Sequence, residues 1–416
     1  MSSSDLWVLI AAAFVFLMQA GFLCFEVGLA RQKHQTAVAM KNLIDWALVS
    51  TLFLTVGFGL MFGQSVFGLI GGSRFGGTVG AVAAPLEIHG VTFLLFQLAF
   101  AGTAVTIVSG ALVERINFAV YMVLSAAMAL LIYPVVGHWV WGGALDPASS
   151  GWLQSLGFHD FAGAGVVHLT GAMVALVGVA MVGPRIGRFR ADGSVADFLP
   201  SNAPLSALGV VILWFGWWGF NGGSTLAATV EVPTVILRTN VGGAGGLLAA
   251  LVVAWRLGAR RNLGQSMMIG ALAGLVAVTA VADHGSLVAA LVVGATAGAA
   301  APLVEQVLLE LQVDDALGVF PVHGSGAIVG LVLGPPLTGA GAHGAGLQLA
   351  IQVVGVISIV TWCLAVAGVV LVVLRRTVGL RVSPAEERHG LGGVDDATAS
   401  VGSSAPLTDA ELADLL

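Results

Sequence analysis

The sequence predicts an all-α integral membrane protein with eleven transmembrane helices, and three observations support this prediction. First, 57% of the 416 residues are hydrophobic, only 9% are charged, and the mean hydropathy is +0.98. A soluble domain carries about 25% charged residues, so most of this surface must face lipid. Second, apolar stretches of about 20 residues, the length that crosses a bilayer, recur along the chain. Third, these stretches are continuous and lack the two-residue alternation of a membrane β-barrel.

The predicted spans follow one another with short connections. The first is expected to remain as a permanent helix, because no basic residue precedes it and no small-residue cleavage site follows it. Both cysteines, Cys24 and Cys363, fall inside spans and are expected to be small buried residues and not a disulfide. In order, the spans are 6–30, 43–66, 89–113, 118–139, 160–183, 204–224, 233–255, 266–283, 286–306, 317–335 and 347–374.

The positive charges predict the orientation of the chain. With the N-terminus outside, the inner segments carry all of the 16 Lys and Arg residues except Arg74 and Arg238. The positive-inside rule therefore places the N-terminus outside and the C-terminus in the cytoplasm, in a multi-pass protein of the cell (cytoplasmic) membrane. The formal net charge of −6 resides in the residues after position 382. We therefore expect a membrane domain over 1–382 and an acidic cytoplasmic tail over 383–416.

An internal repeat lies in the fifth and tenth predicted spans. The segment 166-VVHLTGAMVALV-177 returns as 321-PVHGSGAIVGLV-332. Each repeat unit therefore holds five spans, and an odd number makes the second unit cross the membrane in the opposite direction. This predicts inverted repeats over about 5–200 and 201–345, followed by a last helix over 347–374. Such repeats place a binding site near the middle of the bilayer.

His168 and His323 occupy equivalent positions in the two repeats. At 1.5 Å per residue, both fall in the middle third of a hydrocarbon core about 30 Å thick. One such histidine could simply form a hydrogen bond to a neighbouring helix. Two at equivalent depths are better explained as lining a pathway, because ionisable groups there are costly. Imidazole both donates and accepts protons, which suits a substrate that is itself a base.

Aromatic residues are concentrated near the outer ends of three spans. Phe96 and Phe100, in 94-LLFQLAFAG-102, share one helix face. The segment 213-LWFGWWGFNGGST-225 places Phe220 deeper than Ser224, and 138-HWVWGG-143 supplies Trp141. Each aromatic alone could belong to an interfacial belt. Together, Trp141, Phe96 and Ser224 could bind a cation, and Phe100 and Phe220 could form a water-excluding plug below it.

Asp160 lies at the expected outer start of the fifth span. It could orient the cation site or bias it electrostatically. It could equally cap the helix, because a carboxylate accepts hydrogen bonds from the free N–H groups of a first turn. The sequence leaves both interpretations open.

Over about residues 5–390, the chain resembles the ammonium transporter (Amt/Mep/Rh) family. The resemblance implies a homotrimer of eleven-helix protomers, each with its own pore. Trp141 and Ser224 indicate the Amt branch, because the Rh branch generally lacks this pair. The matching motifs are 110-GALVERINF-118, 138-HWVWGG-143, 159-HDFAGAGVVH-168, 219-GFNGGS-224, 313-VDDALGVFPVHG-324 and 377-TVGLRV-382.

The resemblance implies a role for each candidate residue near the outer mouth. Trp141, Phe96 and Ser224 resemble the ammonium recruitment site of the family. Phe100 and Phe220 resemble its stacked phenylalanine gate.

Deeper in the pore, His168 and His323 resemble the twin-histidine pair of the family, and Asp160 resembles its structural and functional aspartate near the outer vestibule. In the family, ammonium is thought to lose its proton before it crosses the apolar pore.

The implied activity is transport and not enzyme catalysis. No catalytic residue, cofactor or metal is expected, and the expected partners are ammonium or ammonia, with methylammonium as a further candidate, and membrane lipid, but no nucleic acid.

Two departures from the family pattern keep other functions open. Arg238, in 233-PTVILRTNVGG-243, could snorkel, pair with Glu231 or line an extra site. The tail keeps 385-AEERHGL-391 and then diverges, which puts in doubt control by a PII-type signal protein and leaves another cytoplasmic partner open. The leading hypothesis is inward ammonium transport. The alternatives are an ammonium sensor that signals through its C-terminal region with little transport, and an Rh-type facilitator of neutral solutes.

Overall fold

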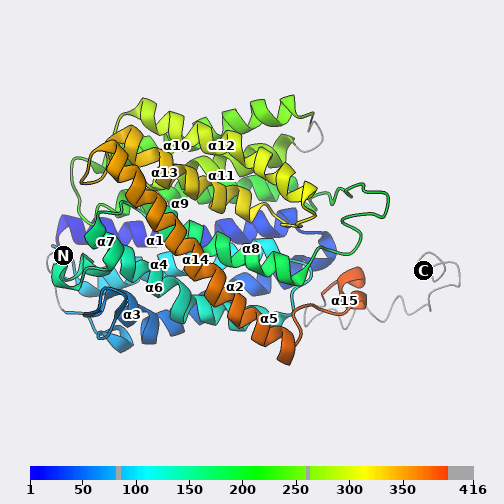
Figure 1. Ribbon diagram of the computed structural model, residues 1–416, viewed down its shortest axis with the longest axis horizontal. Coiled ribbons are helices and arrows are strands. Elements are labelled where there is room, and N and C mark those ends of the chain that lie inside the picture. The colour runs from blue at the N-terminus through cyan, green and yellow to red at the C-terminus, as the bar shows by residue number, and fades with distance from the viewer. Residues whose placement is uncertain (81–85, 259–262, 392–416) are drawn as a thin grey trace, which may run out of the picture.

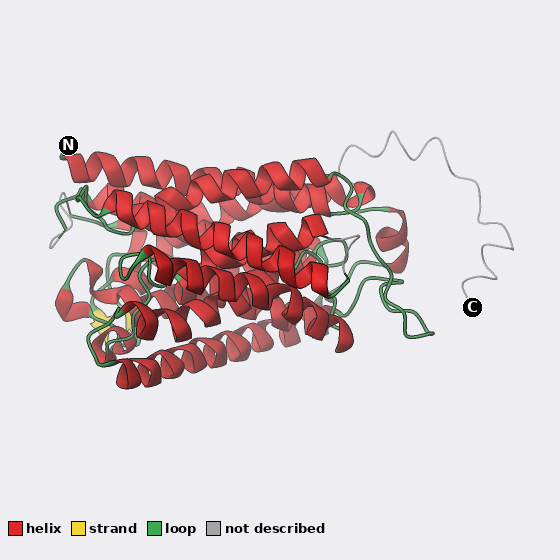
Figure 2. Ribbon diagram, turned by 90° about the horizontal axis from the view of Figure 1, so that it is seen from above, coloured by secondary structure: helices red, strands yellow, loops and turns green. Residues whose placement is uncertain are grey.

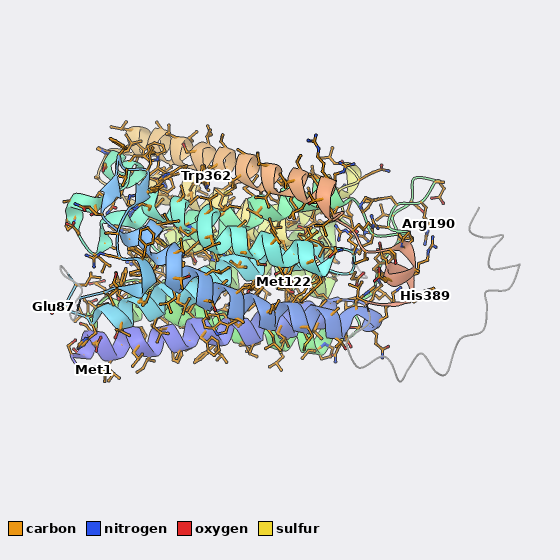
Figure 3. All side chains as sticks on the ribbon, turned by 90° about the horizontal axis from the view of Figure 1, so that it is seen from below. Met1, Glu87, Met122, Arg190, Trp362 and His389 are labelled. Carbon is orange, nitrogen blue, oxygen red and sulfur yellow. The ribbon has the colours of Figure 1, made fainter. Side chains whose placement is uncertain are left out.

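The computed structural model describes residues 1–80, 86–258 and 263–391, and these residues form an elongated helical bundle (Figure 1). The long helices run side by side between two faces. Met1 and Glu87 lie at one end of the molecule and Arg190 and His389 at the other (Figure 3). We call these ends the N-terminal face and the C-terminal face.

The helices account for most of the described chain. Four π-helical segments adjoin α-helices, at Phe53–Gly57, Met128–Ile132, Ala164–Leu169 and Phe320–Gly324. Short 3-10 turns lie at Gln32–His34, Phe75–Gly77, Gly142–Ala144 and Pro147–Ser149. The α-helices are α1 (Ser3–Leu29), α2 (Gln35–Leu52), α3 (Phe58–Phe62), α4 (Gly90–Leu112), α5 (Phe118–Ala127), α6 (Tyr133–Trp141), α7 (Trp152–Leu156), α8 (Thr170–Val182), α9 (Ala203–Gly223), α10 (Val232–Arg256), α11 (Leu263–Thr279), α12 (Leu287–Glu310), α13 (Ser325–Thr338), α14 (Ala345–Thr377) and α15 (Pro384–His389).

One small β-hairpin lies on the N-terminal face (Figure 2). Strand β1 (Ser65–Val66) pairs antiparallel with β2 (Ile70–Gly71), with Ser65 opposite Gly71 and Val66 opposite Ile70. Phe67 and Gly68 in the turn have positive φ angles of 55° and 74°. The hairpin therefore reverses the chain between two membrane-crossing helices.

The prediction of eleven spans is confirmed, with one shorter than expected. Ten helical stretches of the described residues are long and apolar enough to cross a membrane, and the eleventh, α11, has 17 residues. It was predicted over 266–283 but ends at Thr279. Ala280, Val281 and Ala282 are apolar and buried, yet they form a turn in which the carbonyl of Ala280 accepts a hydrogen bond from Phe161 N. Hydropathy does not distinguish a buried turn from a helix end.

The predicted start of the second span, residue 43, is wrong, because α2 begins at Gln35. The first turns of α2, up to Asp45, carry polar side chains that form hydrogen bonds inside the bundle. Asn42 Nδ2 donates to Glu26 Oε2 over 3.0 Å. Asp45 accepts hydrogen bonds from the hydroxyls of Tyr121 and Ser125. A hydropathy average counts each of these polar residues as unfavourable in a membrane and ignores the hydrogen bonds between them.

Small residues allow a close approach between α10 and α12. A Cβ on Gly294 would overlap the carbonyl oxygen of Gly242, and one on Gly298 would overlap that of Gly246. Each pair of glycines is spaced by four residues and so lies on one helix face. Close backbone contact is how membrane helices gain packing energy when lipid and side chains are equally apolar.

The direction of the helices agrees with an inverted arrangement of the two repeats. The π-helical segment before α8 begins at the N-terminal face, and the one before α13 begins at the C-terminal face. Helix α14 then crosses the bundle diagonally, in orange in Figure 1. Of the acidic tail predicted over 383–416, residues 392–416 lie outside the described residues.

Candidate functional site

The two repeat histidines meet inside the bundle. His168 Nδ1 lies 3.1 Å from His323 Nδ1, and the rings are nearly parallel, with centroids 5.2 Å apart and an interplanar angle of 14°. Both side chains are buried. A hydrogen bond between two Nδ1 atoms needs one proton, so one ring must donate and the other accept. The second nitrogen of one ring is then an acceptor, and that of the other ring is a donor.

Asp160 caps the segment that carries His168. Its Oδ1 accepts a hydrogen bond from Gly163 N over 3.0 Å, and its Oδ2 accepts from Gly165 N and Val166 N over 2.8 and 2.9 Å. Gly163 has φ of 104°, and a Cβ there would press against Trp141. Of the two interpretations of Asp160, the capping geometry is the one observed.

Asp315 is the counterpart of Asp160 in the second repeat, and the sequence analysis missed it. Each aspartate precedes its histidine by eight residues. Asp315 Oδ2 accepts a hydrogen bond from Phe320 N over 2.7 Å, at the start of the π-helical segment that carries His323. The equal spacing of aspartate and histidine in the two repeats was the signal that could have found it.

The three residues predicted to recruit a cation line one cavity on the N-terminal face. Trp141 is fixed there by a 2.9 Å hydrogen bond from its Nε1 to the carbonyl of Asp160. Ser224 Oγ donates to the carbonyl of Phe220 over 2.8 Å, which leaves its lone pairs free to accept a hydrogen bond. The cavity has a volume of about 110 Å³ and is lined by Phe96, Gln97, Phe100, Trp141, Ala144, Gln154, Phe161, Ser224 and Leu226.

Phe100 and Phe220 stack on one another below this cavity. Their ring centroids are 4.0 Å apart and the interplanar angle is 16°, and both side chains are buried. Phe100 lines the cavity, and Phe220 lies 5.4 Å, between ring centroids, from His168. The stacked pair therefore separates the cavity from the histidines.

Trp217 also contacts the histidine pair, although the sequence analysis did not select it. Its ring stacks on His168 with a centroid distance of 5.3 Å, and its Nε1 donates to Thr279 Oγ1 over 2.9 Å. Trp217 precedes Phe220 by three residues on α9, so the two share a helix face. That spacing could have identified it.

Glu26 is a third residue that the sequence analysis missed. It is buried and, with Phe22, Phe25 and His323, lines a space of about 20 Å³ on the C-terminal side of the histidines. Its Oε2 accepts hydrogen bonds from Asn42 and Ser109. A carboxylate inside the first apolar run is a functional-site signal in itself.

Ion pairs hold the loops of the C-terminal face together. Arg185 donates to both oxygens of Asp314 over 2.8 and 2.9 Å, and Glu114 pairs with Arg31 and with Arg185. Burial alone would raise the pKa of the Asp314 carboxyl, but its hydrogen bonds and charge interaction with Arg185 hold that pKa well below its usual range. The face is therefore fixed by charges, in contrast to the aromatic N-terminal side.

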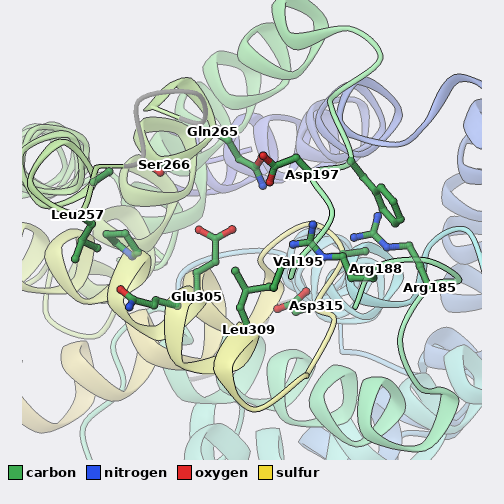
Figure 4. Close-up of a pocket in the computed structure, with 15 residues that line it drawn as sticks. Arg185, Arg188, Val195, Asp197, Leu257, Gln265, Ser266, Glu305, Leu309 and Asp315 are labelled. Atoms are coloured by element: carbon green, nitrogen blue, oxygen red, sulfur yellow. The ribbon is translucent and has the colours of Figure 1, made fainter. Parts of the chain in front are cut away.

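Beside these pairs lies a cavity of about 250 Å³ (Figure 4). Figure 4 shows Arg188, Glu305, Asp197 and Asp315 around it. The cavity also contacts α10, α11 and α12, and it lies away from the histidines. It is lined by Arg185, Arg188, Val195, Asp197, Phe198, Ala254, Leu257, Gln265, Ser266, Pro302, Glu305, Gln306, Leu309, Asp315 and Ala316.

The structure shows the contacts of both features that depart from the family pattern, Arg238 and the start of the tail. Arg238 donates to the carbonyl of Ala282, in the turn after α11, over 3.1 Å. The start of the tail is docked on the C-terminal face, because Glu387 accepts a hydrogen bond from Ile186 N over 2.7 Å and pairs with Arg381. Ser383 and Glu386 form a capping box at the start of α15.

Comparison with known proteins gives a consistent result. The model of the Ammonium Transporter Family matches residues 6–397. A putative ammonium transporter of Synechocystis sp. is 42% identical over 405 residues, which covers 94% of this chain and 73% of the relative. The ammonium transporter Amt2 of Archaeoglobus fulgidus is 36% identical over 412 residues, covering 92% and 85%.

Solved structures share the fold. A protein titled "Sensor Amt Protein" superposes with a TM-score of 0.89 at 38% identity, covering 94% of this chain and 98% of that one. Mep2 of Saccharomyces cerevisiae superposes with a TM-score of 0.81 at 27% identity, covering 92% and 88%. With the match of the family model over nearly the whole sequence, these similarities show that the chain belongs to the ammonium transporter family.

Proposed function

We propose that the chain transports ammonium, with its N-terminal face outside and its C-terminal face in the cytoplasm. The observation that carries the proposal is the order of three features along one line. A cavity with a Trp face and a Ser hydroxyl comes first, a stacked pair of phenylalanines second, and a hydrogen-bonded histidine pair third. This order suits a cation that binds at the cavity and sheds its charge before it goes further.

Recruitment would take place at Trp141, Phe96 and Ser224. Aromatic faces attract a cation, and the Ser224 oxygen can accept one of its N–H groups. Alkali-metal ions lack N–H donors, so the hydroxyl favours ammonium over ions of similar charge. The carbonyl of Asp160 and the Trp141 Nε1 group keep the indole in place during binding.

Passage beyond the cavity would require loss of a proton. The stacked Phe100 and Phe220 leave no polar group to replace the water around an ion, and moving a bare charge into such surroundings is far more costly than moving neutral ammonia. The His168–His323 pair then offers one acceptor and one donor nitrogen to a small base and its proton.

The direct test is the current evoked by an ammonium pulse on proteoliposomes of the purified chain, with sodium and potassium pulses as controls. We expect a saturable, ammonium-specific current whose decay becomes faster as the protein density rises. A current of equal size with potassium would contradict the recruitment site. A pulse with methylammonium extends the test to a larger substrate.

A sensor function is the second candidate, and the 0.89 TM-score to the protein titled "Sensor Amt Protein" favours it. In this case the cavity would bind ammonium, and the docked segment around α15 would transmit the signal. No current, from protein that ammonium still stabilises against heat, would indicate binding without passage. The output would then be sought at the tail, where a cytoplasmic partner other than a PII-type protein would bind.

We also propose that the chain forms a homotrimer with a pore in each protomer. Support comes from the family membership and from the apolar side chains exposed along the helices, such as Leu43, Leu248 and Ile357. Light scattering of the detergent-solubilised protein measures the mass directly. A mass of one chain, about 42.2 kDa after subtraction of detergent, would contradict the trimer.

A further inference from the structure

A second cluster of ionisable side chains lies on the N-terminal face, outside the pathway described above. His159 Nε2 lies 3.3 Å from Asp283 Oδ1, and His284 Nδ1 lies 2.8 Å from Asp283 Oδ2. The three ligand-type atoms are all within 4.8 Å of one another. Among the described residues, it is the one group of three or more His, Cys, Asp or Glu side chains that converge in this way.

We propose that His159, Asp283 and His284 bind a divalent transition-metal ion, with zinc as the reference ion. Imidazole nitrogen and carboxylate oxygen are the ligands that zinc takes most readily after thiolate. In a tetrahedral site with Zn–N bonds of about 2.0 to 2.1 Å, neighbouring ligand atoms lie about 3.3 Å apart. The spacings of 3.3 and 2.8 Å are close to this value, so small side-chain rotations complete the site, with water as the fourth ligand.

The two imidazole rings approach the same carboxylate from different directions. Their centroids are 5.4 Å apart and their planes are nearly perpendicular, at 87°. The rings are therefore not stacked on one another, and one nitrogen of each lies within 4.8 Å of the other and of a carboxylate oxygen. The side chains of His159 and Asp283 are 18% and 22% exposed and that of His284 is 47% exposed, so an ion can enter from solvent.

The backbone on each side of the cluster is already held in place. His159 N donates to Gln352 Oε1 and the carbonyl of His159 accepts from Gln352 Nε2, each over 2.8 Å. On the other side, Arg238 donates to the carbonyl of Ala282, next to Asp283. Ligands that are fixed before binding lose little entropy when the ion arrives. Arg238, in the seventh predicted span, therefore helps to hold the backbone beside Asp283 in place.

The ion would join the segment before Phe161, which lines the recruitment cavity, to the residues that follow α11. His159 comes directly before Asp160, and Asp283 follows the turn whose carbonyls accept hydrogen bonds from Phe161 N and Ala162 N over 3.1 Å. A metal bond between these segments adds a cross-link to two backbone hydrogen bonds. We therefore expect bound zinc to raise the thermal stability of the protein.

The experiment uses the full chain in detergent after removal of any polyhistidine tag. Cobalt(II) is the probe, because a tetrahedral site gives it strong visible absorption, and zinc is then added to displace it. We expect one cobalt per chain and a rise in Tm with zinc. Asp283→Asn and His284→Asn should weaken cobalt binding by more than about tenfold, since even outer partners of metal ligands change affinity by that factor.

The matched control is His89→Asn, which removes an exposed histidine from the same face and should bind cobalt as the wild type does. Gel filtration and the Tm without metal check that each variant is folded. Absence of cobalt binding, or equal affinity in Asp283→Asn and the wild type, would show that the cluster is a hydrogen-bonded His-Asp-His relay and would overturn the proposal.

Anomalous scattering at the zinc absorption edge, measured on crystals of the wild type, gives an answer that does not depend on variants. A peak between His159 and Asp283 supports the site. A peak only at other histidines overturns it.

Discussion

The two histidine segments have similar local structure and different surroundings. In each, an aspartate caps a π-helical segment and the histidine follows it by eight residues. His168 packs against Trp217 and Phe220, below a cavity of about 110 Å³. His323 packs near Phe22, beside a space of about 20 Å³ that Glu26 also lines.

This comparison distinguishes the contribution of the repeated backbone from the contribution of the side chains around each histidine. The repeated backbone brings two imidazoles together from opposite faces, which a single segment could not do. The side chains around them are not repeated, and on the N-terminal side they form a cavity with aromatic rings and a hydroxyl acceptor. Recognition of a cation is therefore expected at one mouth, and the C-terminal face is held by ion pairs instead.

The largest expected effect concerns the histidine that lies next to the phenylalanine stack. His168→Ala removes both the Nδ1 partner of His323 and the ring that packs on Trp217, so we expect the ammonium-selective current to fall to background. The measurement is the proteoliposome current described above. His343→Ala, which changes an exposed histidine of the N-terminal face, is the control. Full ammonium-selective current in His168→Ala would contradict a relay through the pair.

The charged face is expected to be the acid-sensitive one. Because the pKa of Asp314 is lowered in the folded protein from its ordinary value of 3.8, its contribution to stability is present above that value and is lost as the pH falls below it. Asp314→Asn leaves Arg185 buried without its main partner and should cost about 3 to 5 kcal/mol.

Thermal unfolding in detergent across acid pH measures this contribution. The wild type should lose stability as the pH falls, and Asp314→Asn should lose less over the same range. Parallel pH profiles for the two proteins would argue against the ion pair as the acid-sensitive element. Asp192→Asn changes an exposed aspartate of the same face and serves as the control.

The two capping aspartates are expected to differ in stability although they are equivalent in the repeat. Asp160 accepts three backbone hydrogen bonds, so Asp160→Ala should cost about 3 kcal/mol at about 1 kcal/mol for each buried donor left unpaired. Asp315 accepts one from a neighbouring N–H of its segment, so Asp315→Ala should cost about 1 kcal/mol. The unfolding midpoints of the two variants in detergent measure these losses of stability. Equal losses in the two variants would mean that the two aspartates stabilise the fold equally.

The smallest expected effect tests the hydroxyl at the cavity. Ser224→Ala removes one hydrogen-bond acceptor and should weaken the apparent affinity for ammonium about fivefold, the equivalent of ~1 kcal/mol, while the maximal current stays. The current is measured over a series of ammonium concentrations. Thr225→Val removes the next hydroxyl, which is not among the residues that line the cavity, and should leave the affinity unchanged. Equal affinities in the wild type and Ser224→Ala would remove Ser224 from the recruitment site.

The sequence alone selected seven of the residues that line or border the proposed pathway, but it missed Trp217 and Glu26. Continuous apolar runs gave the spans, and the repeated phrase around His168 and His323 gave their opposite directions. The sequence also placed Phe96 and Phe100 on one face of one helix, because the four-residue spacing is a property of a single helix. It did not find Glu26, although this carboxylate lies inside the first predicted span, 6–30.

What the sequence determined is local: which segments cross a membrane, which face of a helix a side chain occupies, and that two histidines lie at equivalent depths. Only the tertiary structure decided which side chains meet. It brought the two Nδ1 atoms within 3.1 Å, made Asp160 a cap, and joined His159 to Asp283 across two turns far apart in the chain. Periodicity along one chain reports burial and facing direction, whereas distances between segments depend on how whole helices pack, and no single segment encodes that.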